Sequence, residues 1–279
     1  MAIKSVGVIG VGTMGAPLAG HLLKGGYTVT VSDPNREAVA ALVRKGAQEA
    51  ASAKEVAAQS ELTLVIVADD AQVQEVCLGP QGILAAARPD HIIAICSTVQ
   101  PATCRMVADA ARAQGIHVLD TPMSRGVAGA VEGTLLLTVG GDAGILERCR
   151  PAFSTFATDI CRLGDIGSGQ VGKIVNNLVL WANVVVVREG LTLAASNGLD
   201  LATLREALIK SSADNFVLRH WDNVAGQPSW WDQKDLKAVL ELAAERGVAA
   251  PVATVTKELI NGFTAEQARK LLPIQVKNK

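Results

Sequence analysis

The stretch Val6-Gly-Val-Ile-Gly10-Val-Gly12-Thr-Met-Gly15, near the start of this 279-residue chain, joins a short apolar segment to three closely spaced glycines. In such a stretch the first glycine permits a tight turn, the second lets the backbone approach a pyrophosphate, and the third lets a helix pack closely on the strand. The N–H groups at the start of that helix then point at the phosphates. We therefore predict a dinucleotide-binding turn made by Gly10, Gly12, Thr13, Met14 and Gly15.

An acidic residue ends the next apolar segment. Asp33 follows Thr28–Ser32, close to the place where a carboxylate meets the ribose hydroxyls of NAD. The same carboxylate would repel the 2′-phosphate of NADP, so we expect NAD to be favoured over NADP. Arg36 competes with this expectation, because a guanidinium can turn toward a 2′-phosphate. The alternative is a glycine-rich turn without a ligand, in which Asp33 only caps the helix that begins near Pro34.

Up to Gly169, short β-branched segments alternate with Ala-rich segments of helical periodicity, which is typical of βαβ units in a parallel sheet. The expected strands are Ile3–Ile9, Thr28–Ser32, Leu62–Val67, His91–Ile95, His117–Asp120, Leu135–Val139 and Asp159–Arg162. The expected helices are Met14–Lys24, Arg36–Lys45, Ala53–Ala58, Ala71–Cys77, Pro101–Ala113 and Ala143–Phe153. From Gln170 onward the periodicity is only helical, with breaks at Gly198, Ser211-Ser212, Gly226-Gln-Pro228 and Gly247 to Pro251. We predict an α/β domain at residues 1–164 and an all-helical domain at residues 165–279.

Composition excludes several classes of partner. The chain has 26 Lys and Arg against 27 Asp and Glu, so it has no basic field for nucleic acid or an anionic membrane surface. The most apolar segment, Ile174 to Val187, contains asparagines and falls short of the roughly 20 apolar residues that span a bilayer. The N-terminus lacks the profile of a signal peptide. The five cysteines have no metal-binding spacing, and we expect them to be buried thiols in a reducing compartment: Cys77, Cys96, Cys104, Cys149 and Cys161. We expect a cytoplasmic protein without a metal site.

A lysine and an amide stand four residues apart in Gly164-Asp-Ile-Gly-Ser-Gly-Gln-Val-Gly-Lys-Ile-Val-Asn-Asn177. On a helix, Lys173 and Asn177 would face the same way and could meet one small molecule. When hydride reduces a carbonyl, negative charge builds on its oxygen, and an ammonium can stabilise that charge and donate a proton. In the oxidising direction the lysine must be neutral, so its pKa must fall from about 10.4. The positive field of a first helical turn would favour this, and the glycines would let the cofactor approach. The alternative is a surface lysine beside a flexible linker.

The order of these motifs resembles the β-hydroxyacid dehydrogenase family, which includes 3-hydroxyisobutyrate dehydrogenase and tartronate semialdehyde reductase. The resemblance covers nearly the whole chain and rests on Gly10 to Gly15, Ser97-Thr98, Asp120-Thr-Pro-Met-Ser-Arg-Gly-Val-Ala-Gly-Ala130, Gly164 to Asn177 and Lys234-Asp235-Leu236. It implies a Rossmann-type domain, a long interdomain helix and a helical domain for substrate binding and oligomerisation. It also implies hydride transfer between NAD(P) and a carboxylate-bearing 3-hydroxy acid or semialdehyde.

By this resemblance, Lys173 takes the position of the catalytic lysine, and Asn177 that of the amide that orients the substrate. Thr98 and Lys234 occupy positions near the nicotinamide and the substrate, and we expect Asp235 to anchor structure. The family's Ser-Gly-Gly loop, which receives the substrate carboxylate, corresponds to Ser124-Arg125-Gly126.

Arg125 departs from the family pattern, in which this position is a glycine. Its guanidinium could form a bidentate pair with a second anionic group of the substrate. Alternatively, it points to solvent and the backbone alone binds. The aromatic residues before Lys234 leave a similar choice between lining the substrate pocket and packing the core: Phe216, Trp221, Trp230 and Trp231.

Two other functions stay open beside the dehydrogenase. An imine reductase on a similar scaffold is disfavoured, because those relatives usually lack the lysine that Lys173 supplies. A non-catalytic dinucleotide-binding module is disfavoured by the complete set of Lys173, Asn177 and Ser124. The aliphatic helical half leaves room for a subunit interface, so we expect a homodimer or homotetramer.

Overall fold

The computed structural model describes residues 2–221 and 230–260. The chain divides into two compact units, Met1–Lys173 and Ile174–Lys279. This division lies inside a long helix and comes later than residue 164, where we expected it. The first turns of that helix are hydrogen-bonded to the sheet, as described with the site below, and therefore belong to the N-terminal unit.

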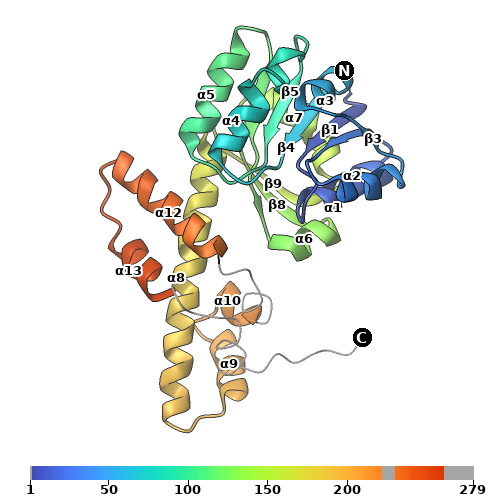
Figure 1. The fold of residues 1–279 in the computed structure, drawn as a ribbon. Helices are drawn as coiled ribbons and strands as arrows, with labels where there is room; N and C mark the ends of the chain where they lie inside the picture. The colour runs from blue at the N-terminus through green and yellow to red at the C-terminus, as the bar shows by residue number, and fades with distance from the viewer. Residues whose placement is uncertain (1, 222–229, 261–279) are drawn as a thin grey trace. The chain divides into compact units, whose positions relative to one another are not determined.

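Among the described residues of the N-terminal unit, nine strands form one sheet, and helices lie around it (Figure 1). The strands are β1 (Ser5–Ile9), β2 (Thr28–Ser32), β3 (Gln48–Glu49), β4 (Leu62–Val65), β5 (Ile92–Ile95), β6 (His117–Asp120), β7 (Met123–Ser124), β8 (Leu135–Gly140) and β9 (Ala157–Gly164). The helices are α1 (Gly15–Lys24), α2 (Arg36–Val43), α3 (Ala53–Gln59), α4 (Asp70–Leu78), the 3₁₀ turn η1 (Ile83–Ala85), α5 (Pro101–Arg112), α6 (Gly126–Glu132) and α7 (Ala143–Phe153).

The sheet is mostly parallel. Its strands lie in the order β3-β2-β1-β4-β5-β6-β8-β7, and β9 pairs with β8. All pairs from β3 to β6 are parallel, whereas β8 is antiparallel to β6 and β7 and parallel to β9. This sheet and the helical unit after it confirm the predicted α/β class. The strand order reverses between β1 and β4, and open parallel sheets bind ligands at the carboxyl ends of the strands beside such a reversal.

Each face of the sheet buries its own core, because side chains alternate along every strand. In β5, Ile92 and Ala94 pack into the core that includes α1, α2 and α7. Their neighbours Ile93 and Ile95 pack into the core that includes α3, α4 and α5. Central strands that are covered by helices on both faces are apolar throughout. This explains why they could be predicted from short apolar segments.

The sequence missed the short elements β3, η1, β7 and α6. Helix α6 shows why, since it has only seven residues and two of them are glycines, which have low helix propensity. It also starts in an unusual way. Arg125 and Gly126 have φ angles of +84° and +62°, a backbone conformation that residues other than glycine rarely adopt. The predicted longer strands and helices of this unit agree with the structure to within two residues at each end.

The helical unit contains most of α8 (Ser168–Ser196), followed by α9 (Leu201–Ile209), α10 (Phe216–Arg219), α12 (Trp230–Glu245) and α13 (Pro251–Ile260). Its core includes Trp181, Leu191, Trp221 and Leu236. The predicted breaks at Gly198, Ser211-Ser212 and Gly247 to Pro251 are confirmed. The break predicted at Gly226-Gln-Pro228 lies outside the described residues.

The aromatic cluster of this unit serves mainly as core. Trp221 is buried, and Trp231 packs against the same cluster of apolar residues. Phe216 is exposed, and its ring stacks on that of His220 with the centroids 4.2 Å apart. The side chain of Trp230 lies outside the described part of the chain. The core-packing alternative therefore holds for Trp221 and Trp231.

Helix α8 is long, as the resemblance implied, and it extends beyond the apolar segment Ile174 to Val187 on both sides. It has 29 residues, and its most apolar 18-residue window has a mean hydropathy of 1.6. By length and composition alone it could cross a membrane, because the helix continues on both sides of Ile174 to Val187. One third of that window is buried (33%), and a core helix outside a membrane passes the same test. That no membrane partner exists stays a prediction.

Four of the five cysteines are buried, as expected, whereas Cys161 is exposed. Cys161 lies on β9, most of whose side chains face solvent. Among the described residues β9 pairs with β8 and lies off the main path of the sheet, where its side chains are little covered. The expectation that all five thiols are buried is therefore wrong for Cys161.

A buried histidine just before β5 should make stability depend on pH. Nδ1 of His91 lies 3.0 Å from the carbonyl oxygen of Ser60, to which it donates, and Nε2 lies 3.0 Å from the Thr63 hydroxyl, from which it accepts. Burial lowers the pKa of His91 to about 4. Because the unfolded pKa is about 6.5, protonation favours the unfolded chain. We expect a stability contribution that is complete above about pH 6.5 and is lost as the pH falls toward 4, approaching about 3 kcal/mol.

Urea unfolding at several pH values tests this expectation. The free energy of unfolding of wild type should decrease more between pH 7 and 5 than that of His91→Gln, by about 2 kcal/mol. His220→Gln removes an exposed histidine and should keep the wild-type pH dependence. Parallel curves for wild type and His91→Gln would contradict the account.

Candidate active site

The predicted glycine turn lies at the carboxyl end of β1, beside the reversal in strand order. Gly10 has a φ of +88°, and a Cβ atom there would collide with the carbonyl oxygen of Ile66. A Cβ atom on Gly15 would collide with the carbonyl oxygen of Gly10. Both glycines are therefore needed to pack α1 against the strands. At Gly12 a Cβ atom would meet nothing within 4 Å, so bare backbone faces the open space that a pyrophosphate requires.

The start of α1 leaves N–H groups for a ligand. Met14 holds the N-cap position, follows Thr13 in the turn and makes no capping hydrogen bond with its side chain. The first N–H groups of a helix carry partial positive charge and bind anions well. The turn thus fits the phosphates of a dinucleotide, which supports the roles predicted for Thr13 and Met14.

Asp33 lies at the end of β2, beside the same turn. Its Oδ2 accepts a hydrogen bond from Val11 N at 2.7 Å, and its Oδ1 accepts one from Asn35 N at 2.7 Å. The side chain of Asn35 caps α2, so the alternative in which Asp33 is that cap is wrong. The guanidinium of Arg36 pairs with Glu49 at 2.6 Å. A carboxylate is therefore held beside the glycine turn, where the ribose of a dinucleotide is expected.

Thr98 follows β5 at the same carboxyl edge of the sheet and is partly buried. The neighbouring Ser97 Oγ accepts a hydrogen bond from Val67 N and donates one to Val67 O, both at 2.8 Å. These bonds fasten the loop after β5 to the loop after β4. Thr98 is thus held at the edge where the nicotinamide is expected.

Two of the predicted site residues meet. Lys173 Nζ donates to Ser124 Oγ at 3.4 Å, a long hydrogen bond. Ser124 is buried at the end of β7, and Lys173 is partly buried on α8. Both residues belong to the N-terminal unit. The Lys173 amine and the Ser124 hydroxyl are therefore neighbours, and their roles toward a substrate stay predictions.

The position of Lys173 along α8 differs from our expectation. The helix begins at Ser168, which places Lys173 in its second turn and not in its first. The positive field of a helix start weakens beyond the first turn, so this field acts less on the lysine than we supposed. Asn177 lies one turn further on, is buried, and accepts a hydrogen bond from Asn176 Nδ2 at 3.0 Å.

Lys234 belongs to the helical unit and is partly buried on α12. Beside it, Asp235 Oδ2 accepts a hydrogen bond from Trp181 Nε1 at 3.0 Å. This bond fixes α12 to α8 and confirms that Asp235 anchors structure. The role of Lys234 near the nicotinamide and the substrate stays a prediction.

The sequence did not reveal the residue that anchors α8. The Asp120 carboxylate is fully buried and accepts hydrogen bonds from Gly167 N at 2.6 Å and from Gln170 N at 2.7 Å. Burial raises its pKa, and these hydrogen bonds oppose the rise. The available signal was a carboxylate directly at the end of a buried apolar strand, where an ionisable group needs partners.

The glycines ahead of Lys173 serve the same anchoring. Gly164 and Gly167 have φ angles of +155° and +95°. A Cβ atom on Gly169 would lie 2.5 Å from the carbonyl oxygen of Thr138 and 2.8 Å from the Asp120 carboxylate. We expected these glycines to let the cofactor approach. In the structure, their close neighbours include the ends of β6 and β8.

The side chain of Arg125 is held by three groups on or near β9. Its guanidinium lies 2.8 Å from the Asp159 carboxylate and donates to the Thr158 hydroxyl at 2.8 Å and to the Thr134 carbonyl oxygen at 2.7 Å. Hydrogen bonds from Thr158 and Arg125 lower the pKa of Asp159. These contacts occupy the guanidinium, so it does not simply point to solvent as one alternative expected. A role in shaping the loop fits the contacts better than either alternative, and the carboxylate site at Ser124 stays a prediction.

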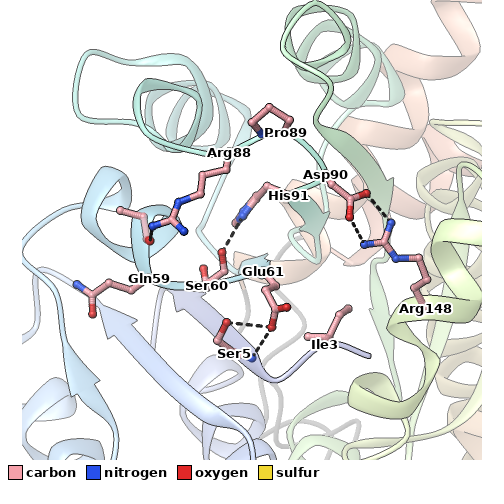
Figure 2. Close-up of a pocket in the computed structure, with 11 residues that line it drawn as sticks. Ile3, Ser5, Gln59, Ser60, Glu61, Arg88, Pro89, Asp90, His91 and Arg148 are labelled. Carbon is pink, nitrogen blue, oxygen red and sulfur yellow. Dashed lines mark hydrogen bonds and ion pairs between the residues drawn. The ribbon is translucent and has the colours of Figure 1, made fainter. Parts of the chain in front are cut away.

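A cavity of about 380 Å³ lies at the opposite edge of the sheet, where strands begin (Figure 2). Ser5 starts β1, and Glu61 precedes β4; Glu61 Oε2 accepts a hydrogen bond from Ser5 N at 3.0 Å. Arg148 donates to both oxygens of Asp90 at 2.7 and 2.8 Å. In Figure 2 Asp90 and Arg148 pair with each other, whereas Glu61 accepts hydrogen bonds from Ser5 and Arg88 donates one to the carbonyl oxygen of Ala58. These polar groups already have partners within the protein, so this cavity is a poor match for a dinucleotide.

Other catalytic chemistries find little support in the described residues. Burial raises the pKa of Cys77, Cys96 and Cys149 to about 12, so these thiols are not nucleophiles. Within residues 2–221 and 230–260, no group of three or more His, Cys, Asp or Glu side chains is placed to hold a metal ion.

Comparisons with known proteins cover most of the chain. The family model for the NAD binding domain of 6-phosphogluconate dehydrogenase matches residues 5–167. The model described as NAD-binding of NADP-dependent 3-hydroxyisobutyrate dehydrogenase matches residues 167–271. The two models meet close to the start of α8.

Individual relatives agree with these models. A 3-hydroxyisobutyrate dehydrogenase of Pseudomonas aeruginosa is 40% identical over 216 residues, which cover 77% of this chain and 72% of the relative. The 2-(hydroxymethyl)glutarate dehydrogenase of Eubacterium barkeri is 34% identical over 268 residues, 93% of this chain and 89% of the relative. A solved structure of Mycobacterium tuberculosis 3-hydroxyisobutyrate dehydrogenase with L-serine has a TM-score of 0.86 at 28% identity and covers 96% of both chains.

The backbone at Arg125 gives a stability prediction. Because the left-handed conformation costs a side chain about 1–2 kcal/mol, Arg125→Ala should be less stable than Arg125→Gly by about that amount. Asp159→Asn removes the ion pair and leaves the backbone unchanged, and exposed pairs contribute about 0–1 kcal/mol. Urea unfolding measures the free energy of unfolding of the three variants, and Arg125→Ala should have a lower value than Arg125→Gly.

The same variants test how Arg125 acts on the substrate. If Arg125 only shapes the loop, Arg125→Gly should change kcat/KM by the same factor for substrates with one and with two carboxylates. A loss confined to substrates with two carboxylates would show instead that the guanidinium binds the second anion.

Proposed function

The chain belongs to the β-hydroxyacid dehydrogenase family, and we propose that it interconverts a 3-hydroxy acid and its semialdehyde with Lys173 as general acid and base. Membership makes it an oxidoreductase that uses a nicotinamide dinucleotide. The observation that carries the role of Lys173 is the 3.4 Å contact between its Nζ and Ser124 Oγ. The bound cofactor would accept hydride as NAD⁺ when the substrate is oxidised and would donate it as NADH when the substrate is reduced.

The residues of the chain then transfer one proton and stabilise one negative charge. In oxidation, neutral Lys173 removes the proton of the substrate hydroxyl as the hydride leaves the carbon that bears that hydroxyl. In reduction, the Lys173 ammonium stabilises the charge that develops on the carbonyl oxygen and donates its proton there. Ser124 and the backbone of Gly126 hold the substrate carboxylate, and Asn177 orients the reacting end.

The substrate class follows from what the names of the relatives have in common. 3-Hydroxyisobutyrate, 2-(hydroxymethyl)glutarate and L-serine all contain a primary alcohol next to a carbon that carries a carboxylate. They differ only in the third substituent of that carbon. We therefore propose substrates of the form HOCH₂–CH(R)–COO⁻. Because the guanidinium of Arg125 is paired with Asp159, the group R need not be anionic.

The two alternative functions are weaker. The imine-reductase relatives usually lack a lysine at the position of Lys173, whereas this chain carries it and places it against Ser124. A module without catalysis would have no need for this contact. Under either alternative, removal of the Lys173 side chain should leave the activity or the dinucleotide affinity of the chain unchanged.

We also propose that the chain forms a homodimer or homotetramer in the cytoplasm. On α8, Val175, Val179, Val186 and Leu193 are each more than half exposed and recur at spacings that share one helix face. Long exposed apolar stripes are typical of protein interfaces. The four buried free thiols suit a reducing compartment.

Replacing the lysine tests the proposed function. Lys173→Ala should lower kcat about 10²- to 10⁴-fold, because that is the usual contribution of a general acid or base. Steady-state kinetics with 3-hydroxyisobutyrate, L-serine and 2-(hydroxymethyl)glutarate measure the loss. NAD affinity, measured by fluorescence titration, should stay near wild type. A variant with more than a few per cent of the wild-type kcat would rule out this role for Lys173.

Asp33 gives the prediction for the cofactor. Wild type should have a higher kcat/KM with NAD than with NADP, because the carboxylate accepts hydrogen bonds from the ribose and repels a 2′-phosphate. Asp33→Ser should reduce or invert this preference. Its unfolding must be measured as well, because Asp33 also accepts the Val11 N–H.

Glu49→Gln is the matched control, since it releases Arg36 without touching Asp33. If this variant alone becomes selective for NADP, Arg36 decides the preference. An NADP preference in wild type would overturn the claim about Asp33.

A further inference from the structure

Gln170 is a fully buried amide in the first turn of α8. Its Nε2 donates to the carbonyl oxygen of Ser97 at 2.8 Å, and its Oε1 accepts from Val99 N at 3.1 Å. These two backbone groups lie on either side of Thr98. The donor and the acceptor of the Gln170 amide are therefore both hydrogen-bonded to the loop that carries Thr98. These two bonds hold that loop in one position.

The same residue is fixed on the helix side. Gln170 N donates to Asp120 Oδ2 at 2.7 Å, and the preceding Gly169 carbonyl accepts from the Thr138 hydroxyl at 3.0 Å. Lys173 follows Gln170 at the i+3 position, where side chains lie on neighbouring parts of the helix surface. The helix turn that carries Lys173 is thus continuous with a turn that is bound to the ends of two strands.

The other end of the loop is tied to a different element. Asp70 Oδ1, on α4, accepts hydrogen bonds from Gln100 N at 2.9 Å and from the Thr103 hydroxyl at 2.6 Å. Without Gln170, these bonds would still hold the loop against α4 and α5. The two hydrogen bonds from the Gln170 side chain to the loop would be lost.

We propose that Gln170 is a positioning residue that fixes the Thr98 loop relative to Lys173, so that the loop facing the nicotinamide and the proton-carrying group keep one geometry. The inference rests on the proposed function, because it needs Lys173 as general acid and base. Gln170 acts through the backbone of Ser97 and Val99.

A glutamate at this position provides a specific test. The Ser97 carbonyl requires a donor and Val99 N requires an acceptor, and only a protonated carboxyl supplies both. The titratable groups around position 170 are Asp120 on β6, Cys104 on α5, Asp70 on α4, and Lys173 on α8 itself. Burial and the nearby carboxylates should keep the introduced carboxyl protonated at low pH and disfavour its ionised form.

The experiment compares the intact enzymes Gln170→Met, Gln170→Glu and Thr138→Val, with NAD and the best substrate among 3-hydroxyisobutyrate, L-serine and 2-(hydroxymethyl)glutarate. Gln170→Met should lower kcat about 10- to 100-fold, because small misplacements of reacting groups have effects of this size. NAD affinity should change little, because the glycine turn and Asp33 are untouched. Thr138→Val removes a hydrogen bond to the same helix turn without touching the loop, and it should reduce stability with little change in kcat.

A kcat of Gln170→Met that equals that of Thr138→Val would overturn the proposal. If Gln170→Met does not fold, the pH profile of Gln170→Glu decides. The ratio of its kcat to that of wild type should rise as the pH falls, and a constant ratio would contradict the proposal. Lys173→Ala separates the two claims. An active Lys173→Ala defeats the proposed function, whereas an inactive Lys173→Ala with a Gln170→Met that behaves like Thr138→Val defeats only this inference.

Discussion

The buried carboxylate of Asp120 accepts the N–H groups of Gly167 and Gln170 at the start of α8, and the rest of the site depends on this interaction. A buried carboxylate without partners is strongly unfavourable, and the first N–H groups of a helix have no partners within the helix. Here the Asp120 carboxylate gains hydrogen-bond donors, and the N–H groups at the start of the helix gain an acceptor. The start of α8 is therefore fixed at the carboxyl end of β6, on the edge of the sheet that carries the glycine turn and Asp33.

This constraint explains why the N-terminal unit includes the first turns of α8 and ends at Lys173. It also gives a purpose to the glycines before Lys173, because Gly169 leaves no room for a side chain between the helix and the strand ends. The lysine projects from the next turn and reaches Ser124 Oγ at 3.4 Å. The anchoring of the helix, the close backbone approach and the contact proposed for catalysis therefore lie along one short segment.

Much of the fold could be predicted because it rests on local patterns. Apolar strands that are buried on both faces, and the three glycines after β1, are visible in any window of the sequence. Asp120 and Gln170 could not be assigned, because their partners are backbone groups 47 to 73 residues away and polar side chains carry no periodic signal. Arg125 was left between two roles for the same reason, since Asp159 and Thr158 become its neighbours only through the pairing of β8 with β9.

The central claim is that Lys173 carries the proton of the reaction. The most direct measurement is the pH dependence of single-turnover hydride transfer in wild type and in Lys173→Ala, with and without methylamine. We expect an ionisation in the wild-type profile that is missing in the variant. Methylamine should partly restore the rate of the variant, and the restored rate should follow the ionisation of the added amine. The same ionisation in both proteins, with no response to the amine, would show that another group carries the proton.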